Sequence, residues 1–137
     1  MSHPFVVQLQ NRPGELAHLA RALATRGIDI RHIAGGGAGC TGCAFLTTDD
    51  DAATREVLHS MGYTFVEGNT IIVEAQDQPG ALAELSEKLA SAGVNIEGVL
   101  IVGRRGGQVE IAFSVDDQQR AREALGATSP LAVPAAW

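Results

Sequence analysis

The stretch QDQPGALAEL, residues 76–85, repeats a pattern that occurs earlier in the chain as QNRPGELAHL, residues 10–19. In each copy a polar turn with Pro-Gly at its centre precedes Leu and Ala at helical spacing, which is typical of a strand-to-helix corner. The similarity continues over residues 10–33 and 76–99 at a constant offset of 66 residues. Because repetition at a fixed offset indicates one structural unit used twice, we predict two domains, residues 1–68 and residues 69–137.

Both copies predict the same order of elements, which is βαββαβ. Pro13 and Pro79 are expected in the first helical turn, where a missing N–H is tolerated, and Gly27 and Gly93 are expected to end the helices in a left-handed conformation. Expected strands cover residues 5–9, 28–34, 43–48 and 63–68, then 69–75, 94–102, 109–115 and 130–137, with glycine-rich turns at 35–39 and 103–107. This order is the split βαβ arrangement. We therefore predict an α+β fold, a duplicated ferredoxin-like sandwich with antiparallel sheets and helices on one face.

The composition of the 137 residues argues against several classes of function. A net charge of −6 disfavours binding to nucleic acid or to an anionic membrane. Hydrophobic residues make up 45% of the chain, enough for a packed core, but no apolar run approaches the roughly 20 residues that span a bilayer. A secretory signal begins with a basic segment followed by an apolar one, and the N-terminus does not show this pattern. We therefore expect a cytoplasmic protein.

The repeated corner carries the chemical groups that a free amino acid needs. The start of a helix offers unpaired N–H groups and partial positive charge to a carboxylate. Gly14 and Gly80 leave the main chain open to a ligand, while the side-chain oxygen of Asn11 or Asp77 can accept hydrogen bonds from an ammonium group. The alternative is that Asn11 and Asp77 only cap their helices.

The segments NRPGELAHLARALATRGIDI and DQPGALAELSEKLASAGVNI resemble the beginning of ACT domains, which are small βαββαβ regulatory modules of amino-acid metabolism. Three features occur in both copies: Asn or Asp two residues before Pro-Gly, a Leu-rich helix, and a Gly-Ile-Asp-Ile or Gly-Val-Asn-Ile sequence. The resemblance extends over essentially the whole chain as a tandem pair. It implies that an amino acid binds at an interface between two modules, whose sheets often join side by side.

The chain also resembles the regulatory part of serine-regulated phosphoglycerate dehydrogenases, in which an Asn before Arg-Pro-Gly and the Asn of Gly-Val-Asn-Ile share the ligand. The resemblance implies a site formed by both copies and made of Asn11, Arg12, Pro13, Gly14, Asn95 and Ile96. A second, divergent site would comprise Asp77, Gln78, Gly80 and Asp29. Because two carboxylates would repel the carboxylate of a ligand, we expect a small amino acid in the first site. The second site is expected to be empty or to bind differently.

Other motifs leave room for different functions. Cys40 and Cys43 form a C-x-x-C pair, which can bind a metal or act as a redox dithiol, but the pair lies between two expected strands and not at a helix start. The glycine-rich run at 35–39 lacks the Lys-Ser or Lys-Thr of a phosphate loop. RNA-recognition modules share the βαββαβ order but use stacking aromatic residues, which make up only 4% of this chain.

The sequence thus predicts a non-catalytic regulatory protein that binds a small amino acid between two ACT-like domains and needs no cofactor. Its output is expected to pass through a separate metabolic enzyme or through changed self-association as a homo-oligomer. Two alternatives stay open. One is a protein–protein interaction scaffold with a vestigial ligand site, and the other is a metal or redox protein based on Cys40 and Cys43.

Overall fold

The computed structural model describes residues 3–126, which divide into two compact units with the boundary between Glu67 and Gly68. Unit 1, residues 3–67, contains β1 (Phe5–Gln10), α1 (Glu15–Thr25), β2 (Ile30–Ala38), β3 (Thr41–Thr48), α2 (Asp51–Ser60) and β4 (Phe65–Glu67). Unit 2, residues 68–126, contains β5 (Asn69–Gln76), α3 (Ala81–Ser91), β6 (Ile96–Arg105), β7 (Gln108–Val115) and α4 (Gln118–Leu125).

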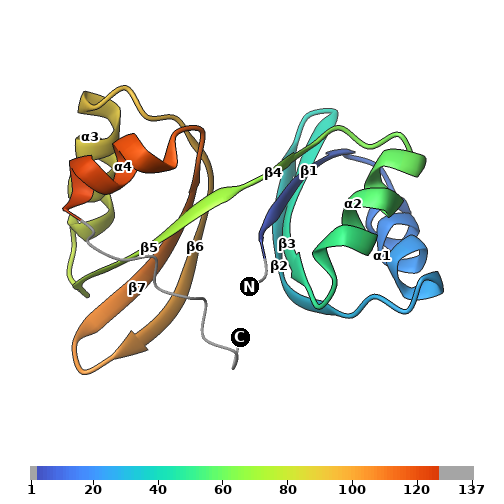
Figure 1. The fold of residues 1–137 in the computed structure, drawn as a ribbon, viewed down its shortest axis with the longest axis horizontal. Helices are drawn as coiled ribbons and strands as arrows, with labels where there is room; N and C mark the ends of the chain where they lie inside the picture. The colour runs from blue at the N-terminus through green and yellow to red at the C-terminus, as the bar shows by residue number, and fades with distance from the viewer. Residues whose placement is uncertain (1–2, 127–137) are drawn as a thin grey trace. The chain divides into compact units, whose positions relative to one another are not determined.

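Each unit is an antiparallel sheet with two helices on one of its faces (Figure 1). The strand order is β2-β3-β1-β4 in unit 1 and β5-β7-β6 in unit 2. The predicted α+β fold with βαββαβ-like units and antiparallel sheets is therefore confirmed. The last predicted strand, residues 130–137, lies outside the described residues.

The alternation of apolar residues along the strands produces the two cores. In β1, Phe5 and Val7 are buried and pair with Leu46 and Ala44 of β3, so all four side chains face the helices. Leu19 and Leu23 of α1 recur at helical spacing and pack onto that face, and Leu85 and Leu89 of α3 do the same in unit 2. Each unit therefore has a hydrophobic core of its own.

The helix starts differ from the prediction. Gly14 and Gly80 precede α1 and α3 with φ of 90° and 93°, a left-handed conformation that other residues rarely adopt. Pro13 and Pro79 therefore lie in the turn before the helix, and their predicted place in the first helical turn is wrong. At the other end, Gly27 and Gly93 follow the helices with φ of 69° and 73°, as predicted.

The glycine-rich run at 35–39 is also not a turn for most of its length. Strand β2 continues to Ala38, and Gly35 and Gly37 pair with Ala44 and Gly42 of β3. Likewise β6 continues to Arg105, into the predicted turn at 103–107. The hydrogen-bonded ladder to the neighbouring strand outweighs the weak strand propensity of glycine, so only the last one or two residues of each run turn the chain.

Candidate functional site

The β1–α1 corner of unit 1 is held against the β2–β3 hairpin by Asn11. The Asn11 side-chain amide donates to the Gly39 carbonyl at 2.9 Å, and the Asn11 main-chain N–H donates to the Cys40 carbonyl at 3.0 Å. Gly14 occupies the cap position of α1, and no side chain of the described residues caps that helix. The interpretation of Asn11 as a helix cap is therefore wrong. Its carboxamide is positioned by the hairpin, with the side-chain oxygen left as an acceptor.

Gly37 provides the space that the Asn11 side chain occupies. A Cβ atom at residue 37 would come within 2.8 Å of both Cγ and Oδ1 of Asn11, closer than carbon and oxygen atoms tolerate. The glycine-rich strand thus has a steric reason that the sequence alone did not show. The signal in the sequence was the run of three glycines at 35–37, which leaves both faces of a strand without side chains.

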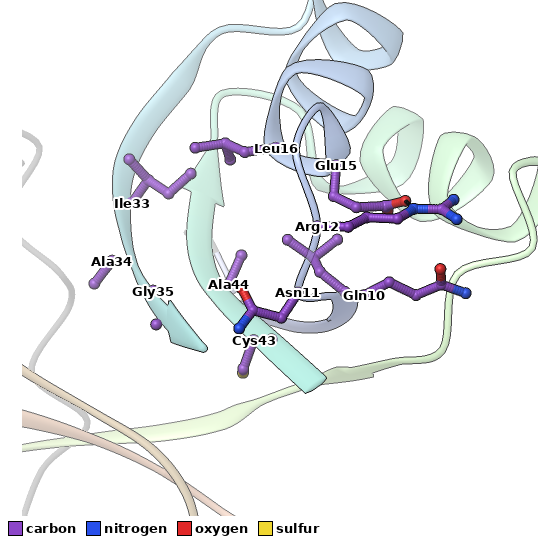
Figure 2. Close-up of a pocket in the computed structure, with 13 residues that line it drawn as sticks. Gln10, Asn11, Arg12, Glu15, Leu16, Ile33, Ala34, Gly35, Cys43 and Ala44 are labelled. Atoms are coloured by element: carbon purple, nitrogen blue, oxygen red, sulfur yellow. Dashed lines mark hydrogen bonds and ion pairs between the residues drawn. The ribbon is translucent and has the colours of Figure 1, made fainter. Parts of the chain in front are cut away.

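A pocket of about 330 Å³ opens beside this corner in unit 1. Its lining is Leu9, Gln10, Asn11, Arg12, Glu15, Leu16, Ile33, Ala34, Gly35, Gly36, Gly42, Cys43 and Ala44. Figure 2 shows Leu16 of α1 and Ile33 of β2 pointing toward one another on one side, with Arg12, Glu15 and Gln10 extending to the other side. The site has one apolar wall and one polar wall, and Asn11 lies between them.

Arg12 is engaged by a neighbour on its own corner. Its Nε donates to Oε1 of Glu15 at 2.6 Å, and the Glu15 side chain is only 16% exposed. The pair also borders a second, more polar pocket of about 410 Å³ that reaches Tyr63. Burial, and next the nearby negative charge of Glu15, raise the pKa of the Tyr63 hydroxyl above its usual value. Neither Glu15 nor Tyr63 was expected from the sequence as a neighbour of the corner.

In unit 2 the equivalent corner is occupied by an ion pair. Asp77 accepts from Nε of Arg104 at 2.9 Å, and Asp29 of unit 1 lies 3.6 Å from Arg31. Each of the two carboxylates of the expected divergent site, Asp77 and Asp29, therefore has a cation within its own unit, which reduces their repulsion of a ligand carboxylate, and the site itself stays a prediction. Neither arginine was considered as a partner from the sequence.

The strand registers explain why Arg104 lies at this position. Gly37 pairs with Gly42 of β3, and Arg104 pairs with Val109 of β7, so Gly37 and Arg104 hold equivalent places in the two units. By the offset of 66, Gly37 would correspond to Gly103. A register shift between Ile101 and Gly103 makes Arg104, one residue later, its structural equivalent. Unit 1 therefore has Asn beside Gly where unit 2 has Asp beside Arg.

Asn95 and Ile96, the remaining residues of the expected site, belong to unit 2. The Asn95 main-chain N–H donates to Asp116 at 2.9 Å, just as that of Asp29 donates to Asp49 in unit 1. The Asn95 side chain is exposed, and within residues 3–126 no hydrogen bond occupies its carboxamide. Arg12 and Asn11 line the unit 1 pocket, and Pro13 and Gly14 lie in the turn beside them. A meeting of Asn11 with Asn95 and Ile96 stays a prediction.

Cys40 and Cys43 are exposed free thiols at the tip of the β2–β3 hairpin. Residues 41–43 belong to strand β3, so three residues of extended chain, about 10 Å, separate the two Cα atoms. A disulfide needs Cα atoms closer than about 7 Å, so this conformation does not allow the pair to close.

Within residues 3–126 no group of three His, Cys, Asp or Glu side chains is arranged to hold a metal ion. In the same range, no helix has the length and apolar character needed to cross a bilayer.

Comparison with known proteins supports the fold. Residues 69–127 match the family model of the ACT domain. No curated protein matches the sequence. Among solved structures, a protein from Bacteroides thetaiotaomicron has a TM-score of 0.64 and 18% identity, over 91% of this chain and 86% of that chain.

Two further structures are regulatory subunits of aspartate kinase. The subunit from Thermus flavus has a TM-score of 0.62 and 23% identity, over 92% of both chains. The ligand-free subunit from Thermus thermophilus has a TM-score of 0.57 and 21% identity, over 92% of this chain and 88% of that chain. At these identities the likeness concerns the fold, and it extends over nearly the full length of the chains compared.

Proposed function

We propose that this chain is a non-catalytic regulatory protein that binds a free α-amino acid at the β1–α1 corner of unit 1. The observation that carries the proposal is the arrangement of Asn11. Its amide nitrogen is tied to Gly39, Gly37 makes room for it, and its oxygen remains as an acceptor beside a pocket of about 330 Å³. The ACT match of residues 69–127 supports a regulatory role for the chain as a whole.

The groups at the corner suit both charges of a zwitterion. The Asn11 oxygen can accept from an ammonium group. Helix α1 has no side-chain cap among the described residues. The Glu15 N–H donates to the Arg12 carbonyl at 3.4 Å, and the next N–H groups of the first turn are open to a carboxylate, which the helix macrodipole also favours. A ligand of this size is expected to bind with a dissociation constant of about 1–100 μM.

Unit 1 would serve as a second ACT-like domain in tandem with the matched one, because its elements from β1 to α2 follow the same order as β5 to α4 and a left-handed glycine likewise precedes its first helix. Asn95 and Ile96 would complete the site from unit 2 of the same chain or of another copy. The divergent corner, with Asp77, Gln78, Gly80 and, from unit 1, Asp29, would then be empty or take a different ligand. The response would be passed to a separate metabolic enzyme in the cytoplasm or to the assembly state of a homo-oligomer.

The test is a thermal-shift titration of the full chain with the twenty amino acids, followed by calorimetry on those that stabilise it. Asn11→Ala and Asn95→Ala should each weaken binding by about tenfold or more, since each removes a hydrogen-bonding partner of a charged group, worth roughly 1.5–3 kcal/mol. Asp77→Ala is the matched control at the other corner. The proposal fails if no amino acid binds.

A scaffold function has one specific observation in its favour. Leu82 and Val99 in unit 2 are each 45% exposed, although they are large apolar residues in regular structure. If amino acids do not bind, and Leu82→Ser abolishes copurification with an enzyme of amino-acid metabolism, the scaffold function is the better description.

A further inference from the structure

We infer that the amino acid at the unit 1 corner has a branched aliphatic side chain, as in leucine, isoleucine and valine. This inference rests on the proposed function, because it assigns a ligand class to the same pocket. Two observations support the inference: the apolar residues that line the pocket, and the pairing of its two charged residues with each other.

The wall that would meet the side chain of the ligand is apolar. Leu16 and Ile33 are 54% and 47% exposed, and Figure 2 shows them pointing toward one another across the mouth of the pocket from α1 and β2. Leu9 and Ala44 also line this pocket. Leaving such surfaces in water is unfavourable, and an aliphatic group between Leu16 and Ile33 would cover both.

The charged residues that line the pocket offer no free counter-charge to a charged side chain of the ligand. Arg12 and Glu15 bind each other at 2.6 Å, and Figure 2 shows both extending away from Ile33 and Ala34. A lysine or aspartate ligand would therefore place its charge against Leu16 and Ile33 without a counter-charge from the described lining residues. A hydroxyl group, as in serine or threonine, would likewise lack a partner on that wall.

Glycines of the strands line the pocket. Gly35 and Gly42 share the face of the sheet that carries Leu9 and Ile33, and neither places a side chain there. The strand pairings place Ile101 and Val109, which have apolar side chains, at the positions of unit 2 equivalent to Gly35 and Gly42. The volume of about 330 Å³ is at the small end of the roughly 300–1,000 Å³ of ligand pockets, which suits a small branched side chain.

The experiment is isothermal titration calorimetry of the full chain with L-leucine, L-isoleucine, L-valine, L-serine, L-threonine, L-lysine and L-aspartate. We expect at least one of the three branched aliphatic amino acids to bind tenfold or more tightly than any of the polar ones. The variants Leu16→Ser and Ile33→Thr should each weaken that binding by about tenfold. Both positions are exposed, so the variants are expected to fold, and circular dichroism would verify it.

Leu82→Ser is the matched control, because Leu82 is the second residue of α3 as Leu16 is of α1. It should leave the affinity within twofold of the parent protein. Tighter binding of a polar amino acid would overturn the aliphatic class and leave the proposed function standing. Aliphatic binding that is insensitive to both Leu16→Ser and Ile33→Thr would overturn the assignment to this pocket. Absence of binding by every amino acid would overturn the proposed function as well.

Discussion

The side-chain amide of Asn11 donates a hydrogen bond of 2.9 Å to the carbonyl of Gly39, a residue 28 positions later in the chain. This bond joins the strand-to-helix corner to the tip of a hairpin. It also orients the Asn11 carboxamide, which lines the unit 1 pocket together with that of Gln10. The corner and the hairpin therefore act together, and changes in the glycine-rich strand are expected to alter ligand binding through Asn11.

The first prediction concerns Gly37→Ala. The added Cβ would lie 2.8 Å from Asn11 Cγ and Oδ1, so the carboxamide must move and its bond to Gly39 weakens. We expect a stability loss of about 1 kcal/mol and about tenfold weaker binding of the amino acid found by titration. Chemical shifts of the Asn11 side-chain amide, measured by NMR, report the displacement directly. Gly103→Ala in β6 of unit 2 is the control, since a Cβ there would meet only the Glu110 side chain, at 3.4 Å. Equal effects of the two variants would contradict the steric role of Gly37.

The second prediction transfers the unit 2 corner to unit 1. Asn11→Asp combined with Gly37→Arg reproduces the pair formed by Asp77 and Arg104, which meet at 2.9 Å. We expect this double variant to fold, because the ion pair replaces the Asn11 hydrogen bond, and to lose ligand binding by more than tenfold, because a carboxylate and an arginine now fill the site. Thermal denaturation and calorimetry together measure the two effects. Asn11→Asp alone should be less stable than the double variant, and the reverse order would contradict the proposed equivalence of Gly37 and Arg104.

The third prediction concerns the dependence of unit 1 stability on pH. Arg55 donates two hydrogen bonds to the Glu67 carboxylate, at 2.7 Å and 2.5 Å, and these bonds hold the pKa of Glu67 below its ordinary value of 4.5. A carboxyl group with a lowered pKa in the folded state stabilises it fully above that ordinary value, and the contribution disappears as the pH falls through the lowered pKa. Glu67→Gln should therefore lower the urea midpoint at pH 7, and the difference from the parent protein should shrink below about pH 4.

Unit 1 can be followed separately in this experiment through the NMR signals of Tyr63, the single tyrosine of the chain. The matched control is Glu84→Gln, at an exposed Glu84 whose partner Lys88 lies one helical turn away in unit 2. Its effect on the unit 1 midpoint should be absent at every pH. A Glu67→Gln difference that stays constant down to pH 3 would show that the ion pair is not its origin.

The fourth prediction concerns Tyr63 itself. Burial and the charge of Glu15 raise the pKa of the Tyr63 hydroxyl above 10.0. Because Glu15 supplies the smaller of the two causes, Glu15→Gln should lower this pKa only in part. Ultraviolet absorbance of the tyrosinate in an alkaline titration measures it, with circular dichroism to verify that the fold persists. Glu56→Gln, at an exposed position of α2 paired with Arg26, is the control. A Tyr63 pKa that is unchanged by Glu15→Gln would show that the two groups do not interact.

Hydrophobic spacing and local backbone preferences were sufficient to predict most of the fold. Phe5 and Val7 alternate as strand residues, Leu19 and Leu23 recur as helical ones, and Gly27 and Gly93 end their helices as expected. These features depend on neighbours within a few positions. The ends of β2 and β6 were predicted wrongly, because the pairing of Gly35 and Gly37 with β3 is a contact between segments that local propensity does not describe.

The sequence by itself determined that a strand-to-helix corner occurs twice and which residues lie at it, because turns and amphipathic helices depend on residues only a few positions apart. Only the tertiary structure decided what each corner residue contacts. Asn11 binds Gly39 and Asp77 binds Arg104 because hairpin register, including the shift near Ile101, brings distant positions to the same point in space. The two corners share one local sequence pattern. Unit 1 has an open pocket and unit 2 an ion pair because strand β2 places Gly37 beside the first corner, whereas β6 places Arg104 beside the second.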